Sequence, residues 1–535
     1  MTLINTLDDF AKISGLKLNH EKCNVLKAGA SKVNIQKQYL DHKHFLWSSE
    51  KAKALGITFT TNRKISLDLN LTPKLEEFKT CLKQWQHRKL TLLGKVTVIK
   101  TFALPKLIYP LTVLQTPPAQ TIKSISDAIQ TFLWDHKPAK IKRDLLTKDY
   151  EEGGIKLANI QYLINSLKCS WVKRIFQNPD DSPIKAMYQH ILNQYGGKYL
   201  FECSLNQNDI QTLFRKNVFI KDILAAWNNI TYIAAAESNF RTCLWNNSLI
   251  RSDNRPIFFK SWFEKSVKYL GDIYDLRTNA FYTFNQMKYL YNIPNNDFLK
   301  YLTLINSFPK AFLLNLKEEH ETTASSKLIE KVIQAKRPNK ILYTYQIEKQ
   351  KTLTNLNIKW GKHFDTTDIN WNIIFKLPFE ATIDNKLRNF QYKYVMGIIR
   401  TNKELYKFSL TNSTLCDFCN TRQDSIYHRF WECECIQQLW NDLKTFLQER
   451  HINIELNFKN VSLGIHGLLR HKLSINYLII CTKYYIFKCF CCSHEPKFLH
   501  LKNYLNEMIR IEKCIAIRKG KLELHLSKWI TLFDI

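Results

Sequence analysis

Four residues with metal-ligating side chains stand close together in the sequence, in the pattern Cys416-x2-Cys419-x8-His428-x4-Cys433. A Cys-x2-Cys turn places two thiolates near enough to share one ion, and a later His and Cys can complete a tetrahedral set. Zinc suits three sulfurs and one nitrogen, and a site closed by four protein ligands is structural. The pattern therefore predicts a structural zinc that folds a polar segment with little core of its own.

Two questions about this segment stay open from the sequence. Cys435 is a rival to Cys433 as the fourth ligand. Aromatic side chains also alternate with the ligands, and they either form the small core of the module or stack on bases. These aromatic residues are Phe418, Tyr427, Phe430 and Trp431.

A second group of cysteines, Cys489, Cys491 and Cys492, precedes His494. Crowding lets few of these side chains converge on one ion, and the surrounding sequence predicts an apolar helix. We interpret them as buried thiols that act as small hydrophobic side chains.

A row of lysines follows one predicted helix and is the candidate contact for a phosphate backbone. Lys95 and Lys106 are 11 residues apart, close to three helical turns, so they share a face unless Pro105 bends the helix. The alternative is an ordinary solvated helix face. The candidate nucleic-acid-binding residues are Lys89, Lys95, Lys100 and Lys106.

No catalytic residue is predicted. The pair Asp8–Asp9 lies in an amphipathic helical segment, where we interpret it as a solvated edge, so no magnesium site is expected. The sequence has no phosphate-binding loop, no His-Glu-x-x-His and no nucleophile elbow.

The chain of 535 residues carries 78 Lys and Arg against 47 Asp and Glu, a net charge of +31. Such an excess argues against an ordinary metabolic enzyme and favours a polyanionic partner, RNA or DNA first. No membrane contact is expected, because Lys483 and Lys488 interrupt the most apolar run. With no export signal recognised, the 14 cysteines are expected to be reduced thiols.

The elements that position these residues are predicted to be mainly α-helical, since Gly and Pro number only 14 each. Periodic apolar positions predict helices over residues 3–14, 90–104 and 119–134. Another helix is expected to start at Thr72–Pro73, with Leu75, Phe78, Leu82 and Trp85 on one face. Short strands are expected near residues 24–27 and 55–60.

Taken together in chain order, many short segments resemble the C-terminal part of a LINE-type (non-LTR) retrotransposon reverse transcriptase. Each segment is weakly specific, and the collinear order carries the resemblance over nearly the whole chain. The segments are Phe10, residues 14–19, residues 22–23, residues 55–57, Trp85, Arg88, Leu90, residues 94–96, residues 99–100, residues 104–106, Tyr109, residues 132–134, residues 153–157, Asp275, Phe284, Tyr291, residues 293–294, Tyr301, residues 386–388, Phe390, the Cys/His set with Trp440, residues 483–486 and Trp529.

The resemblance implies five regions, and it identifies residues 55–57 (Leu55, Gly56 and Ile57) as primer-grip-like, although Ala54 stands where an aromatic residue is usual. The regions are an α/β palm remnant (1–70), a helical thumb (71–155), a helical linker (156–400), a zinc-knuckle module (401–440) and C-terminal helices (441–535). The family's aromatic-Ala-Asp-Asp motif would lie upstream of Met1. We therefore expect nucleic-acid binding and no polymerase activity from this chain alone.

Three alternatives to this truncated, binding-only protein remain. One is a fragment of a full RNA-directed DNA polymerase whose upstream exons are missing. Another is a domesticated scaffold that binds proteins. The third is an unexpressed relic that has no function. The resemblance also implies RNA, DNA or other retroelement proteins as partners, and a location inside the cell, in the nucleus or cytoplasm.

Overall fold

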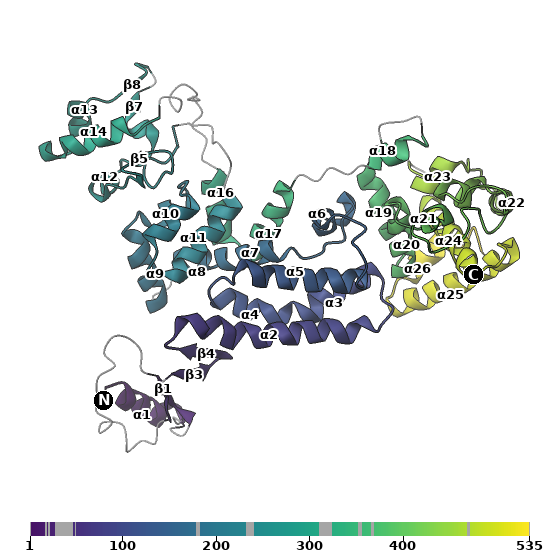
Figure 1. Ribbon diagram of the computed structural model, residues 1–535, viewed down its shortest axis with the longest axis horizontal. Coiled ribbons are helices and arrows are strands. Elements are labelled where there is room, and N and C mark those ends of the chain that lie inside the picture. The colour runs from purple at the N-terminus through teal and green to yellow at the C-terminus, as the bar shows by residue number, and fades with distance from the viewer. Residues whose placement is uncertain are drawn as a thin grey trace. The chain divides into compact units, whose positions relative to one another are not determined.

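The structure is a computed structural model, and it describes residues 2–16, 19, 22–26, 46–48, 50–177, 182–231, 240–275, 277–309, 324–350, 356–364, 369–467 and 471–533. It is mainly helical, as predicted, with small two-stranded sheets in the described part (Figure 1). Lys17 and Leu18, within one segment that carries the family resemblance, lie outside the described residues.

The chain divides into two compact units, each assembled from segments far apart in the sequence. Unit 1 comprises Met1–Gln84, Lys100–Ile129 and Asn159–Gln350. Unit 2 comprises Trp85–Ile99, Gln130–Ala158 and Lys351–Ile535.

Unit 1 begins with helix α1 (Thr2–Ser14), as the periodicity predicts, and with two small sheets. Strand β1 (Asn24–Leu26) pairs in parallel with β2 (Leu46–Ser48). Strands β3 (Lys51–Ala54) and β4 (Ile57–Thr60) form an antiparallel hairpin. Its two-residue turn, Leu55–Gly56, has φ of 50° and 79°, the left-handed backbone that a tight hairpin turn requires.

Helix α2 (Arg63–Gln86) starts earlier than the sequence predicts, and Pro73 lies inside it. The prediction that Thr72–Pro73 begins this helix is therefore wrong. The extra turns are held by Asn70, whose side chain accepts from the Thr58 N–H (2.7 Å) and donates to the Thr58 carbonyl (2.9 Å). These two hydrogen bonds fasten the helix to β4 and offset the bond that proline cannot make.

The lysine-bearing region is also broken into shorter helices. It contains α3 (Leu92–Val98), a π-helix η4 (Ile99–Ala103) and α4 (Pro105–Val113), with a bend of 50° between Leu92–Ala103 and Pro105–Val113. The next helix, α5 (Ala119–Trp134), has the predicted bounds. Among the described residues no single helix has the length and apolarity of a membrane span. The bent pair Leu92–Ala103 and Pro105–Val113 reaches that length and apolarity only when its two parts are taken together.

The rest of unit 1 forms two hydrophobic cores. Helices α7, α8, α10, α11, α16 and α17 surround one of them, and Asn165 of α7 donates to Gln346 of α17 (3.0 Å). The second core, around Trp245 and Trp262, lies under short hairpins and the pair α13 and α14. The bounds are α7 (Ile160–Cys169), α8 (Trp171–Phe176), α9 (Pro183–Asn193), η6 (Gly197–Phe201), α10 (Gln207–Leu213), α11 (Val218–Thr231), β5 (Arg251–Ser252), β6 (Arg255–Pro256), α12 (Lys260–Glu264), η7 (Leu270–Asp272), β7 (Tyr274–Asp275), β8 (Ala280–Phe281), α13 (Phe284–Tyr291), η8 (Asn295–Asp297), α14 (Phe298–Asn306), α16 (Ala324–Gln334) and α17 (Pro338–Lys349).

Unit 2 is organised around the buried helix α24 (Lys472–Cys491), which contacts α19, α20, α25 and α26. These helices gather at the C-terminal end of the chain in Figure 1. Helix α3 joins them through the Leu92 N–H, which donates to Asn389 Oδ1 of α20 (3.1 Å). The remaining bounds are α6 (Arg143–Thr147), η5 (Tyr150–Glu152), α18 (Leu356–Gly361), α19 (Trp371–Ala381), α20 (Asn385–Val395), α21 (Asn402–Lys407), η9 (His428–Glu432), α22 (Glu434–Gln448), α23 (Phe458–Leu463), α25 (Phe498–Arg518) and α26 (Leu522–Trp529).

Candidate metal centre

The structure brings together Cys416, Cys419, His428 and Cys433, with their ligand atoms all within 4.8 Å of one another. Cys435, the rival fourth ligand, is not part of this group. Cys433 therefore completes the set.

The backbone around the first two cysteines is a tight turn. Leu415 and Gln423 form an antiparallel bridge, and the Cys416 N–H donates to the Arg422 carbonyl (2.9 Å). Asn420 then adopts a left-handed φ of 54° and donates its N–H back to the Cys416 carbonyl (2.8 Å). The loop thereby turns both thiols toward one point.

The other two ligands lie at the ends of one short element. His428 opens the π-helix η9, where its N–H donates to Ser425 Oγ (3.0 Å). Cys433 follows η9 directly and precedes α22. Single-turn π-helices are rare and concentrate at functional sites, because the wider turn re-aims side chains.

The imidazole of His428 is held between the thiols and a carboxylate. Its Nε2 lies 3.3 Å from Cys419 Sγ, and its Nδ1 lies 3.1 Å from Glu432 Oε2. Glu432 is itself held by Arg422 (2.8 Å). Histidine ligands commonly use their second nitrogen in this way, since a carboxylate fixes the ring orientation and strengthens the ligand.

Hydrogen bonds to the sulfurs of Cys416 and Cys419 favour the thiolate form of these two residues. A hydrogen bond from the Cys433 thiol lowers the pKa of Cys416 to about 5, and the same interaction raises the pKa of Cys433. Burial raises the pKa of Cys419, but hydrogen bonds from Thr421 and Arg422 outweigh it and lower that pKa to about 7. A thiolate is the form that binds metal.

Beside the ligands, Arg429 and Asp424 form an ion pair whose side chains are both fully buried. Arg429 Nε donates to Asp424 Oδ1 (2.9 Å), and Nη1 donates to the Arg400 carbonyl (3.0 Å). The guanidinium carbon also lies 3.3 Å from the ring centroid of Phe490 on α24. The arginine next to the histidine ligand thus anchors the module to the central helix.

Three sulfurs and one imidazole nitrogen fit zinc, and four protein ligands leave no position open for a substrate. The donor set therefore supports a structural zinc. Zinc bound here would cross-link the tight turn to η9, and the chain's own residues would orient His428 and exclude water.

The aromatic residues of the module pack inside unit 2. Phe430 is fully buried and contacts Tyr394 edge-on at 5.1 Å between centroids. The other three also meet rings of the same unit: Tyr427 meets Phe458, Trp431 meets Trp440, and Phe418 meets Phe490. These contacts favour the core role for the aromatic residues.

In the second cysteine group, only Cys489 is buried; Cys491 and Cys492 are exposed at the end of α24. The interpretation of all three as buried thiols is therefore wrong. The helix ends at this point and the chain leaves the core, so apolar neighbours in sequence do not cover the last two.

The predicted phosphate-contacting lysines are dispersed. Lys89 and Lys100 are exposed, and Lys106 is half-buried. Lys95 is buried, with its Nζ 2.6 Å from Asp135 Oδ1 and a hydrogen bond to the Leu133 carbonyl (3.2 Å). Because of the bend before Pro105, Lys95 and Lys106 do not share the face of one straight helix.

In the primer-grip-like segment, Leu55 and Gly56 form the exposed hairpin turn and Ile57 is buried. The Leu55 carbonyl accepts a hydrogen bond from the hydroxyl of Tyr109 on α4 (3.0 Å). Asp9, half of the acidic pair considered for metal, is exposed and pairs with Lys12 (2.8 Å).

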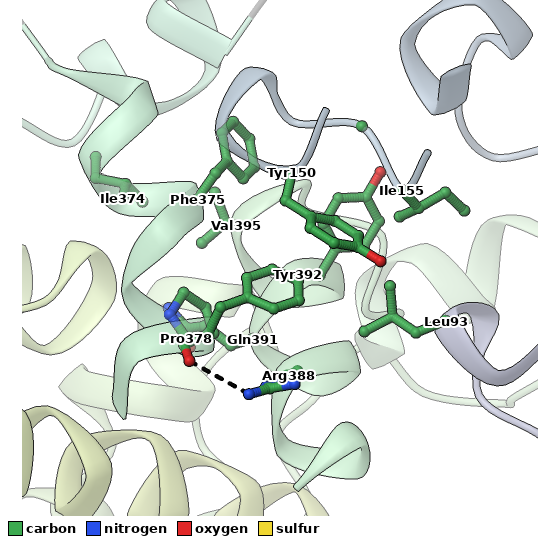
Figure 2. Close-up of a pocket in the computed structure, with 12 residues that line it drawn as sticks. Leu93, Tyr150, Ile155, Ile374, Phe375, Pro378, Arg388, Gln391, Tyr392 and Val395 are labelled. Carbon is green, nitrogen blue, oxygen red and sulfur yellow. Dashed lines mark hydrogen bonds between the residues drawn. The ribbon is translucent and has the colours of Figure 1, made fainter. Parts of the chain in front are cut away.

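Unit 2 also contains a small pocket with mostly apolar walls, formed by residues that include Leu93, Tyr150, Phe375 and Tyr392 (Figure 2). Arg388 lies at its edge and donates to the Phe379 carbonyl (3.2 Å). The lining contains no carboxylate, cysteine, serine or histidine. Its ionisable side chains are Tyr150, Tyr392 and Arg388.

Several residues of the metal centre were missed from the sequence. Glu432 had a detectable signal, since it follows His428 by four residues, one helical turn away. The buried partners Asp424 and Arg429 gave no such signal, because only the fold shows that they are covered.

Comparison with known families adds one finding. Residues 339–440 match the family described as zinc-binding in reverse transcriptase (zf-RVT). The matched range contains all four ligands. The match supports a reverse-transcriptase-related protein with a zinc-binding region.

Proposed function

We propose that this chain is the C-terminal part of a LINE-type reverse transcriptase and that it binds RNA or DNA without polymerase activity of its own. The observation that carries the proposal is the match of residues 339–440 to the zinc-binding region of reverse transcriptases, with the Cys/His centre inside it. The net charge of +31 supports a polyanionic partner.

The expected binding is dominated by phosphate contacts and depends weakly on base sequence. In this proposal, zinc at the Cys/His centre maintains the fold of a module that contributes to the nucleic-acid-binding surface. Polymerisation would need converging carboxylates for two metal ions, and the sequence contains no aromatic-Ala-Asp-Asp.

The test is a binding and primer-extension assay on one purified sample, with homopolymer RNA template, DNA primer and Mg²⁺. We expect binding that weakens steeply from low to high salt and no extension. Affinity that is flat with salt would contradict phosphate-dominated binding. Extension would contradict the absence of a polymerase site, and retention of proteins without nucleic-acid binding would favour the scaffold alternative.

A further inference from the structure

A group of cations collects in unit 2 where α3, α20 and the segment after α5 meet. The Leu92–Asn389 hydrogen bond fixes α3 against α20. One turn beyond it stand Lys95 and Lys393. Lys95 pairs with Asp135, and the chain then turns through left-handed conformations at Asp135 and His136. Lys137 and Lys140 follow this turn.

The cations lie near enough to act on one another. Partial desolvation lowers the pKa of Lys140, whose side chain is nevertheless exposed, and the positive charges of Arg400, Lys393 and Lys137 lower it further. Burial also lowers the pKa of Lys393, with Lys95 adding to the effect. The acids that oppose these shifts are Asp135 and Glu404.

Positive charge exceeds negative charge at this place. Asp135 is already paired with Lys95. Within the part of the chain that the structure describes, no carboxylate forms an ion pair with Lys137, Lys140, Lys393 or Arg400. We call these four residues the basic cluster. Like charges that outnumber the nearby acids are costly to hold together, and an external anion would relieve that cost.

We propose that the basic cluster binds the phosphate backbone of a nucleic-acid strand. This inference rests on the proposed function and assigns the nucleic-acid binding to the basic cluster of unit 2. The cluster holds four positive charges near one another, so it can contact more than one phosphate of a nucleic-acid strand. Arg400 adds a planar group that can bind one phosphate with two hydrogen bonds.

The metal centre positions part of this cluster. The Arg400 carbonyl accepts from Arg429, the residue beside the ligand His428. The Arg400 guanidinium carbon lies 4.7 Å from the Phe408 ring centroid, which restrains its direction. The basic cluster and the zinc-binding module are therefore continuous within unit 2.

The test compares variants of the full chain by fluorescence anisotropy with a short homopolymer RNA over a range of salt concentrations. Lys137→Gln with Lys140→Gln changes two exposed positions and should leave the fold intact. Lys393→Gln tests the half-buried member separately. The control, Lys519→Gln with Lys521→Gln, removes two exposed charges of the same unit that lie outside the cluster.

We expect the Lys137/Lys140 variant to bind roughly 50-fold more weakly near 0.1 M salt, with a salt slope smaller by about 2. The control should change affinity by less than about threefold. Equal losses in the variant and the control would overturn the assignment of the cluster while leaving nucleic-acid binding in place. Failure of the unaltered chain to bind RNA would overturn the proposed function itself. Displacement of RNA by inorganic phosphate at constant ionic strength, from the unaltered chain only, would show a free-phosphate site instead of a strand site.

Discussion

Nδ1 of His428 lies 3.1 Å from Oε2 of Glu432. The imidazole therefore faces the three thiols through Nε2, and the Glu432 carboxylate holds it at Nδ1. Both residues belong to η9, and its π-helical turn sets their spacing. The carboxylate can hold the proton on Nδ1 and leave Nε2 as the metal ligand.

Glu432→Gln should therefore weaken zinc binding without removing a ligand. We expect a loss of affinity of about 10- to 100-fold, measured by competition with a chromophoric chelator. Glu434→Gln is the matched control, because Glu434 is exposed two residues away. Equal affinity in the two variants would show that Glu432 does not support the histidine.

Removing two ligands should abolish the site. Cys416→Ser combined with His428→Ala should lower the zinc content of the purified chain to background, because the remaining two thiols cannot close a tetrahedral set. Elemental analysis measures this, with Cys435→Ser as the variant that should keep its zinc. If the unaltered chain holds no more zinc than the double variant, the site does not bind zinc.

Asp424→Asn should destabilise unit 2 strongly. The substitution leaves the Arg429 guanidinium fully buried without its counter-charge, which costs about 3–5 kcal/mol. A shift of the urea midpoint, followed by tryptophan fluorescence, measures the loss. Glu77→Gln breaks a half-exposed ion pair with Lys74 and should leave the midpoint unchanged. A midpoint for Asp424→Asn that matches this control would contradict the structural role of the buried pair.

Lys483 is expected to make the folded protein more stable as the pH rises. Burial lowers the pKa of this fully buried lysine well below 10.5, and its Nζ lies 3.4 Å from the Ser462 carbonyl. Between the lowered pKa and 10.5, the unfolded chain binds a proton that the folded chain does not, so stability rises with pH in that window.

Lys483→Met should remove that slope and stabilise the protein at neutral pH by about 1–4 kcal/mol. Melting temperatures measured at neutral and at mildly alkaline pH test the prediction. Lys488→Met, at an exposed position of the same helix, is the control. A destabilised Lys483→Met variant would mean that the ammonium is well solvated or paired in the folded protein.

Sequence patterns predicted the features that depend on neighbouring residues. The helix over residues 119–134 has its predicted bounds, because amphipathic spacing alone positions it. The four ligands converge because a Cys-x2-Cys turn is a local structure. The mainly helical fold was predictable because the spacing of apolar residues and the small number of Gly and Pro are also local features.

Features that depend on distant partners were not predictable in this way. Pro73 lies inside α2 because Asn70 is bonded to a strand that precedes the helix. Lys95 is buried because the end of α5 supplies Asp135 and the Leu133 carbonyl. No local pattern indicates that the segment around Leu92 packs with α20.

The packing of the segment around Leu92 with α20 has a consequence for folding during synthesis. Leu92 and Asn389 are separated by 297 residues, and the Tyr392 hydroxyl meets the Gly153 carbonyl across 239 residues. At roughly 5–20 residues per second, the segment around Leu92 waits about 15–60 s on the ribosome before its partner helix is synthesised. During that time Leu92, Leu93 and Val96, which are buried in the finished fold, lack the part of their cover that α20 provides.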